Sequence, residues 1–345
     1  MFLSICVLAV AFRTVVKFLE VFSEKLLLAL AIPSEHQDLP VKHEDVTVLN
    51  MTVGANFKGE DIENKISEVT ISAGSEPQYV ISDNAHNLVR GILDSGNVHY
   101  ADISHSMGVI LKKVYEKQPD FVELTTLLGK KRLQYHLTNK AYLLPPNMRT
   151  IARFMNMSEW VIWGNSMLAC YNKLPKEMQE AYAFINDYES LLQELMDAIR
   201  HIEYICKNKG FSCKTSKECQ SYIVAHVIGN AYPRQAHLGL KMLEYFRKEE
   251  AQLTEDMNIC ISSDIIESTF GIYKSKKSPN KLYGITPFAL MIPLYPKVVN
   301  ESVTKTFNFK ERLVNVNLKD IDAWTTEHLS KNWVTERTKT LKQVS

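Results

Sequence analysis

The sequence lacks an excess of charge of either sign. It carries 40 Lys and Arg residues against 39 Asp and Glu residues, a formal net charge of +1. A nucleic-acid function therefore cannot be argued from total charge and requires local basic clusters. Internal repeats and low-complexity tracts are also missing, and 46% of the residues are hydrophobic. A chain of 345 residues with this composition is expected to build a globular core.

Closely spaced cysteine pairs are missing too. The six cysteines are scattered, and only Cys206, Cys213 and Cys219 lie near one another. Their spacing does not match the short pairs of a zinc site, and a chain of this size does not depend on disulfides for stability. We therefore expect reduced, unligated thiols in a cytoplasmic protein.

No hydrophobic run is long enough to span a bilayer. The apolar start, residues 1–12, is shorter than the roughly 20 residues that a membrane helix needs. No basic residue precedes it, as one would in a signal peptide, and Arg13 and Lys17 follow at once. The segment is expected to be a buried strand or helix, and no membrane partner is expected.

Strand-like and helix-like segments alternate in the first third of the chain. Three strand-like segments come first, at 13–18, 24–32 and 44–51. They are followed by a helix over 59–74, a strand over 78–83, a helix over 84–96, a strand over 98–102 and a helix over 103–117. This order predicts an α/β fold whose mixed sheet has an antiparallel edge continued by parallel strands.

The pattern then becomes almost entirely helical. Helical periodicity dominates from about 120 to 255, for example in 178–208 and 233–253, and the end of the chain is polar except for 323–329. The predicted organisation is a first part of the α/β core at 1–119, a helical insertion at 120–255, a second part of the core at 256–300, and a tail at 301–345.

Two acidic residues follow predicted strands. Asp83 and Asp102 come directly after such strands, which is where open α/β sheets place functional groups. Carboxylates gathered there suit Mg²⁺ or Mn²⁺. The alternative is that each aspartate caps the helix that follows it. His105 lies three residues after Asp102 on the same helix face, as a supporting group or as a partly buried histidine.

A third acid, Glu267, starts a helix after the helical block. The sequence Asp264-Ile265-Ile266-Glu267 fits a capping box, in which the glutamate reaches back to the first amide of the helix. Glu267 also shares a helical stripe with Gly271 and Lys274. The neighbouring stripe is apolar and consists of Ile266, Phe270 and Tyr273.

Taken together, these segments resemble the catalytic domain of RNase H-like DDE/D transposases. The resemblance is carried by YVISDNAHNLVRGI, HYADISHSMGVILKK and, after the helical block, SSDIIESTFGIYKSK. It is greatest to transposases of prokaryotic insertion sequences with an all-helical insertion before the final glutamate. It spans about residues 14–300, and LPPNMR and ARFMN in the insertion add to it.

The resemblance implies an RNase H-like mixed sheet and two-metal cleavage and transfer of DNA strands in transposition. It implies that Asp83 and Glu267 are catalytic, metal-binding carboxylates, with Asp102 and His105 in supporting positions. It further implies two Mg²⁺ or Mn²⁺ ions and a homo-oligomer assembled on transposon-end and target DNA.

The first acid of the family's triad is missing. Alignment of Lys25 with the family's lysine puts Val16 at the position of that aspartate, and the usual upstream DNA-binding region is also missing. The resemblance therefore implies a truncated or degraded copy with little or no cleavage activity.

Two other functions remain open. The first is a DNA-binding remnant without catalysis, because two basic clusters can contact phosphates. Their members are Lys274, Lys276, Lys277 and Lys281, and in the insertion Lys130, Lys131 and Arg132. In that case Trp160 and Trp163 are either stacking groups for DNA or core residues. The second function is a helical scaffold without a nucleic-acid role.

Overall fold

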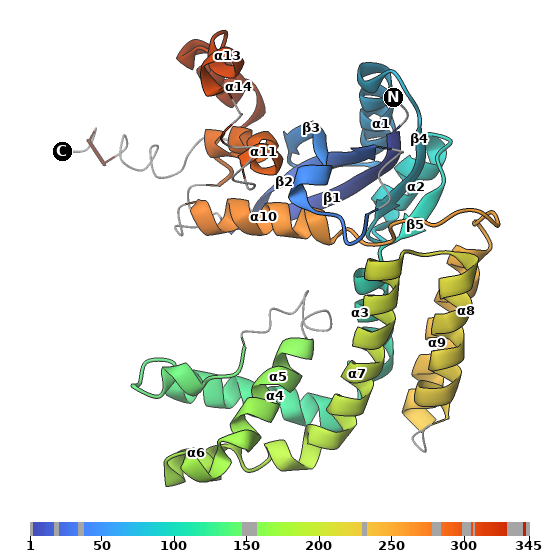
Figure 1. The fold of residues 1–345 in the computed structure, drawn as a ribbon. Helices are drawn as coiled ribbons and strands as arrows, with labels where there is room; N and C mark the ends of the chain where they lie inside the picture. The colour runs from blue at the N-terminus through green and yellow to red at the C-terminus, as the bar shows by residue number, and fades with distance from the viewer. Residues whose placement is uncertain are drawn as a thin grey trace. The chain divides into compact units, whose positions relative to one another are not determined.

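The computed structural model describes residues 3–16, 21–33, 38–146, 157–229, 233–277, 284–298, 305, 308–329 and 341–342. The chain divides into two compact units. Unit 1 is discontinuous and combines Met1–Asp102 with Cys260–Ser345, whereas unit 2 is the continuous segment Ile103–Ile259. Unit 1 is mixed α/β, and unit 2 is helical (Figure 1).

Unit 1 is built on a five-stranded sheet with the order β3-β2-β1-β4-β5. The neighbours β1–β2 and β2–β3 are antiparallel, and β1–β4 and β4–β5 are parallel. The first part of the unit contains β1 (Leu3–Val16), β2 (Val21–Pro33), the 3₁₀ turn η1 (His43–Asp45), β3 (Thr47–Gly54), α1 (Gly59–Ala73), β4 (Pro77–Ser82), α2 (His86–Asp94) and β5 (His99–Ala101). The α/β class with an antiparallel edge and parallel additions is therefore confirmed.

The second part of unit 1 carries the helix of Glu267. It contains α10 (Asp264–Lys276), the 3₁₀ segment η6 (Pro287–Leu294), α11 (Tyr295–Val298), α13 (Phe309–Leu313) and α14 (Leu318–His328). Helix α10 contacts β1 and η6. None of the residues of α14 is buried, so the core candidates expected at 323–329 are wrong.

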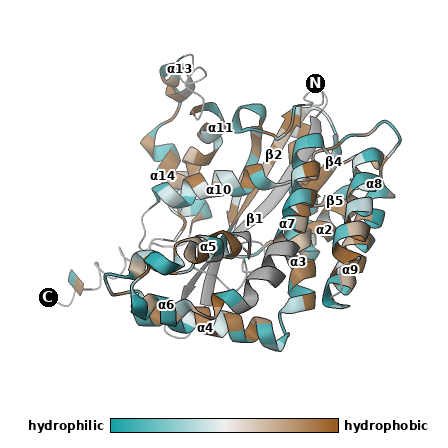
Figure 2. Cartoon of the chain, turned by 60° about the horizontal axis from the view of Figure 1, so that its bottom comes forward, coloured by the Kyte–Doolittle hydropathy of each residue, from teal (hydrophilic) through white to brown (hydrophobic). Residues whose placement is uncertain are grey.

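The apolar part of β2 is covered on both faces. In β2, residues 26–32 are all at most 5% exposed, and this part of the strand is hydrophobic (Figure 2). On one face, Leu27 and Val80 pack against Ile62 and Ile66 of α1 and Leu88 of α2. The apolar run therefore predicts the position of β2 correctly.

Strand β1 combines two segments that the sequence analysis separates, the apolar start and the strand-like segment that begins at Arg13. It runs from the apolar start of the chain through Arg13 to Val16, so the expectation of a strand or helix at 1–12 is met by a strand. In the parallel pair, Leu8 lies opposite Ser82, the last residue of β4. Val16 is eight residues further along β1, about 26 Å at 3.3 Å per residue. Leu8, not Val16, therefore lies beside the end of β4, so Val16 does not occupy the place next to Asp83 that the first acid of the triad would need.

Helices α1 and α2 pack at close range. Helix α1 ends at Gly74, which adopts a left-handed conformation (φ 70°) and donates to Thr70, as the expected glycine stop requires. A Cβ added to Gly91 of α2 would lie 2.4 Å from the carbonyl oxygen of Gly59 and 2.5 Å from Cβ of Ile62. Gly91 is therefore required by the approach of the two helices.

Unit 2 consists of helices. They are α3 (Ile103–Tyr115), α4 (Pro119–Tyr135), η2 (Ala141–Leu143), α5 (Met157–Ala169), η3 (Tyr171–Lys173), α6 (Lys176–Tyr182), α7 (Ile185–Lys209), α8 (Cys213–Tyr222), the π-helical η4 (Ile223–Ile228) and α9 (Pro233–Glu250). Helix α3, which the sequence assigns to the core at 1–119, contacts α7 and α9 and belongs to unit 2. Within the described residues, no helix combines the length and apolar character of a membrane span.

Both tryptophans of the insertion belong to its core. Trp160 is 6% exposed and packs with Leu124 and Leu128. Trp163 donates from Nε1 to the carbonyl oxygen of Leu143 and meets the Tyr182 ring edge-on, with 5.4 Å between ring centroids. The core interpretation of Trp160 and Trp163 is therefore the one that the structure supports.

The cysteines whose side chains are described are free thiols, as expected. Cys206 and Cys219 are buried with their Sγ atoms 3.9 Å apart, joined by a hydrogen bond and not by a disulfide. This hydrogen bond and burial both raise the pKa of the Cys206 thiol. Cys206 is therefore a protonated thiol in the packing between α7 and α8.

Candidate functional site

The candidate site is at the ends of β4 and β5, where the second part of unit 1 joins the first. Asp83 directly follows β4 and is partly buried. Its Oδ1 accepts a hydrogen bond from the backbone amide of Ala85 at 2.9 Å. Ala85, not Asp83, is the N-cap residue of α2, so the alternative that Asp83 caps this helix is wrong. Asp83 instead forms a local turn that leads into the helix.

Asp102 fastens the Glu267 helix to the end of β5. Its side chain is 2% exposed, and Oδ2 accepts two hydrogen bonds from Ser263, one from the backbone amide at 2.6 Å and one from the hydroxyl at 2.9 Å. Ser263 is the N-cap residue of α10. A buried carboxylate at a helix N-terminus is favoured both by these charge-assisted bonds and by the helix dipole. Asp102 therefore determines where α10 begins.

A second bond connects the same segment to β4. The backbone amide of Cys260 donates to Oη of Tyr79 at 3.1 Å, and both groups are buried. Burial raises the pKa of Tyr79 well above its usual value, so the phenol stays protonated. The segment 260–263 is thus hydrogen-bonded to Tyr79 of β4 and to Asp102, the residue after β5.

The capping box expected at Asp264–Glu267 is not formed. The helix begins at Asp264, its N-cap is Ser263, and the hydroxyl of Ser263 donates to Asp102 instead of capping the helix. Since Asp264 is the first helical residue, Glu267 is one position too late to reach back to the cap. The side chain of Glu267 is exposed on the helix surface.

Helix α10 has the two faces that its sequence predicts. Ile266, Phe270 and Tyr273 are buried, while Glu267 and Gly271 are exposed. No atom lies within 4 Å of the Cβ that an alanine would add at Gly271. The stripe from Glu267 through Gly271 to Lys274 is therefore an exposed surface of α10.

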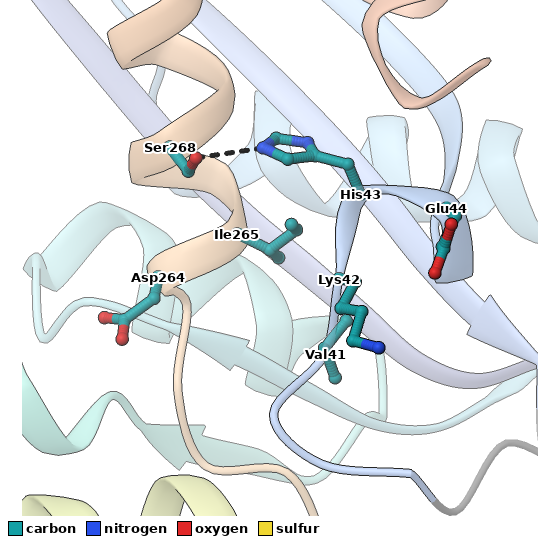
Figure 3. A pocket seen from close by; sticks show the side chains of 7 residues that line it. All are labelled: Val41, Lys42, His43, Glu44, Asp264, Ile265 and Ser268. Carbon is teal, nitrogen blue, oxygen red and sulfur yellow. Dashed lines mark hydrogen bonds between the residues drawn. The ribbon is translucent and has the colours of Figure 1, made fainter. Parts of the chain in front are cut away.

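An open pocket of about 430 Å³ lies beside this stripe (Figure 3). It is lined by Val41, Lys42, His43, Glu44, Asp264, Ile265 and Ser268. Nε2 of His43 and Oγ of Ser268 are hydrogen-bonded at 2.9 Å, and burial lowers the pKa of the imidazole. His43 is therefore mainly neutral at pH 7.

A serine–histidine pair at this distance also resembles a nucleophile and its base. Such a pair needs a third group that orients the imidazole. Within the described part of the chain, Nδ1 of His43 is buried without a hydrogen-bond partner. We therefore assign the pair the role of connecting η1 to α10.

The lysines at the end of α10 pack over aromatic rings. Lys274, Lys276 and Lys277 lie with Nζ 5.9, 5.6 and 5.8 Å from ring centroids, over Phe270, Tyr295 and Tyr273 respectively. Cations at a helix C-terminus also interact favourably with its dipole. The three lysines thus lie near aromatic rings of unit 1. Lys281 lies outside the described residues.

The remaining predicted residues belong to unit 2. His105 is partly buried in the first turn of α3. In α4, Lys130 is exposed and Lys131 is partly buried. Arg132 donates to the carbonyl oxygen of Pro145 at 2.7 Å, so its guanidinium holds the loop after α4. Of this cluster, Lys130 has the most exposed position.

The carboxylates do not fit a two-metal centre. Such a centre needs three of them, and the described residues contain no group of three or more His, Cys, Asp and Glu side chains that could hold a metal ion. Asp102 is bonded to Ser263, and Val16, Leu8 and Ala9 of β1 carry no ligand atom. Only Asp83 and Glu267 remain from the set that the resemblance implies.

Sequence reasoning missed three contributors to this site: Tyr79, His43 and Ser263. Their hydrogen-bond partners are between 161 and 225 positions away in the chain, so no short sequence motif predicts these contacts. The only available signal was the strand-end position of Asp102, which pointed to the correct region but to a different role. No protein-family model matches the sequence, and no curated protein matches it either.

Proposed function

We propose that this protein binds DNA through unit 1 and is related in fold to RNase H-like DDE/D transposases, but does not cleave DNA efficiently. The observation that carries the proposal is the sheet of unit 1. Its antiparallel strands β3-β2-β1 are continued by parallel β4 and β5, and α10 returns to the ends of these strands after an inserted helical unit. A mixed sheet interrupted by a helical unit supports the resemblance.

The exposed stripe of α10 supports contact with a phosphate backbone. Glu267, Gly271 and Lys274 are all exposed, and Lys276 extends the positive charge toward the end of the helix. Lysines that pack over rings present their ammonium groups with less loss of side-chain entropy on binding. Salt-dependent, sequence-tolerant binding is the behaviour expected from such contacts.

The catalytic part of the resemblance is less well supported. Two-metal phosphodiester chemistry requires carboxylates that share two ions, and here one of three positions has no carboxylate while Asp102 holds Ser263. We therefore assign Asp83 and Glu267 to a site that has lost its metal-binding capacity. Cleavage and strand transfer in transposition are not part of the proposed activity.

Fluorescence anisotropy with a labelled duplex oligonucleotide tests the binding. Substitution of Lys274, Lys276 and Lys277 by Gln should make the plot of log binding constant against log salt concentration less steep. The magnitude of its slope should fall by up to about 2.7, at 0.9 per phosphate contact. The matched control neutralises three exposed lysines elsewhere in unit 1, Lys58, Lys310 and Lys319. Equal slopes for the wild type and the first variant would refute the role of α10.

A plasmid-nicking assay with Mg²⁺ or Mn²⁺ tests the catalytic part. We expect the same background nicking from the wild-type protein and from Glu267→Gln. Nicking by the wild type that Glu267→Gln abolishes would establish a functional metal site and overturn the non-catalytic proposal.

A further inference from the structure

Helix α14 contacts unit 1 without becoming part of its core. None of its residues is buried, and the helix contacts β3 (Figure 1). Three of its residues, Ile321, Trp324 and Thr325, are partly buried, and the others are exposed. Because these three follow one another at i, i+3 and i+4, they share one helix face. A single narrow face therefore attaches α14 to unit 1.

The strand that α14 contacts is at the edge of the sheet. In the order β3-β2-β1-β4-β5, β3 is the terminal strand. Its eight residues, TVLNMTVG, include no charged residue and no proline. Its pairing with β2 shifts register beside Leu49 and is regular over 50–54. Edge strands pair readily with other chains, and proteins protect them with charges, proline, bulges or a covering helix.

The two faces of β3 differ in polarity. Leu49 packs against the core cluster that contains Ile62 of α1, and Val53 is 7% exposed. Asn50 and Thr52 lie on the opposite face, where Oγ1 of Thr52 donates to Oδ1 of Asn50 at 2.7 Å. Away from the core, β3 is therefore polar over residues 50–52, which limits the apolar surface that α14 covers.

The charges around β3 make its edge complementary to a second copy of itself. Glu44 and Asp45 come just before the strand, Lys58 follows it, and Lys25 of β2 lies opposite Gly54 at its end. In an antiparallel pair related by a two-fold axis, the start of β3 in one copy lies beside the end of β3 in the other. Each acidic end then meets a basic end, and the uncharged strands pair between them.

We propose that α14 is a strap that blocks the edge of β3, and that its release allows the β3 strands of two copies to pair as antiparallel neighbours. The sheet is then continuous across the dimer. Release is easy because a helix without buried residues gives up little apolar burial when it leaves. This pairing needs no DNA, so it is independent of the proposed DNA-binding function.

Light scattering coupled to size-exclusion chromatography tests the strap on the full-length protein without DNA. Trp324→Asp places a charge on the face of α14 that is directed at unit 1. The wild type should have the molar mass of one chain, and Trp324→Asp should have twice that mass. The matched control is Leu318→Asp, which adds the same charge to α14 at a position that is 79% exposed and should leave the mass unchanged. Ile321→Asp is a second variant of the attaching face and should also double the mass.

A second substitution tests whether β3 is the pairing edge. When residues 50–54 pair with their counterparts, Thr52 lies at the two-fold axis, so Thr52→Lys places two lysines opposite each other. Added to Trp324→Asp, it should restore the mass of one chain. The proposal is refuted if Trp324→Asp and Ile321→Asp keep that mass, or if their dimers persist with Thr52→Lys. A wild-type dimer that Thr52→Lys dissociates would show an open edge and overturn the role of α14 as a strap.

Discussion

The connection between Asp102 and Ser263 makes a quantitative prediction about α10. In Asp102→Ala, the amide and the hydroxyl of Ser263 lose a shared acceptor at a position that is only 7% exposed. Hydrogen bonds to a charged group contribute about 1.5–3 kcal/mol each, and losses from one network are not additive. We therefore expect a cost of about 3–4 kcal/mol, concentrated at the start of α10.

Hydrogen exchange measured by mass spectrometry reports this local cost. A peptide covering residues 260–270 should exchange roughly 100- to 700-fold faster in Asp102→Ala than in the wild type, since each 1.4 kcal/mol is a factor of ten. Asp102→Asn keeps one carbonyl acceptor and should lose about half of the free energy. Peptides from α7 and α9 in unit 2 should be unchanged.

Asp94→Ala is the matched control. It also removes an aspartate of unit 1, but one whose partner Arg90 has a side chain that is 67% exposed. Such a surface pair contributes about 0.3–0.5 kcal/mol. Exchange in residues 260–270 that is equally fast in Asp102→Ala and Asp94→Ala would show that Asp102 does not hold α10, and the reasoning would fail.

Two further perturbations test the packing and the electrostatics. Gly91→Ala should destabilise unit 1 by about 1–3 kcal/mol, because the added Cβ would meet Gly59 and Ile62. Gly271→Ala has open space around it and should stabilise α10 by about 0.5–1 kcal/mol. Urea unfolding of both variants measures the difference, and equal effects would contradict the packing described for Gly91. The hydrogen bonds from Arg234 lower the pKa of Asp120, so this pair stabilises unit 2 above about pH 4 and its contribution is lost as the pH falls through the lowered pKa. Asp120→Asn should therefore reduce stability at pH 7, by up to about 1 kcal/mol for a partly exposed pair, and this loss should shrink as the pH falls through the lowered pKa. A loss of the same size at pH 7 and in strong acid would exclude this origin.

The elements of the sheet could be predicted because their causes are local. The apolar run of β2 follows from burial on both faces, and the end of α1 follows from the glycine at 74. For the candidate site, the sequence predicted the region, the ends of β4 and β5, but not the role of Asp102. Asp102 and Ser263 are 161 positions apart, and the competition between a capping box and a bond to Asp102 is decided by tertiary contact. For the same reason, the sequence does not decide whether Trp160 and Trp163 are core residues, and the structure places both in packed clusters of unit 2.

The discontinuity of unit 1 has a consequence for synthesis on the ribosome. Translation at roughly 5–20 residues per second separates the completion of β5 from the arrival of α10 by on the order of 10–30 seconds, because unit 2 is made in between. During this interval Asp102 has no Ser263 to bind, and the apolar side chains that later contact α10 are uncovered. Unit 2, a continuous segment, has time to fold first. Nascent chains stalled before residue 260 should therefore be the form of this protein that chaperones recognise best.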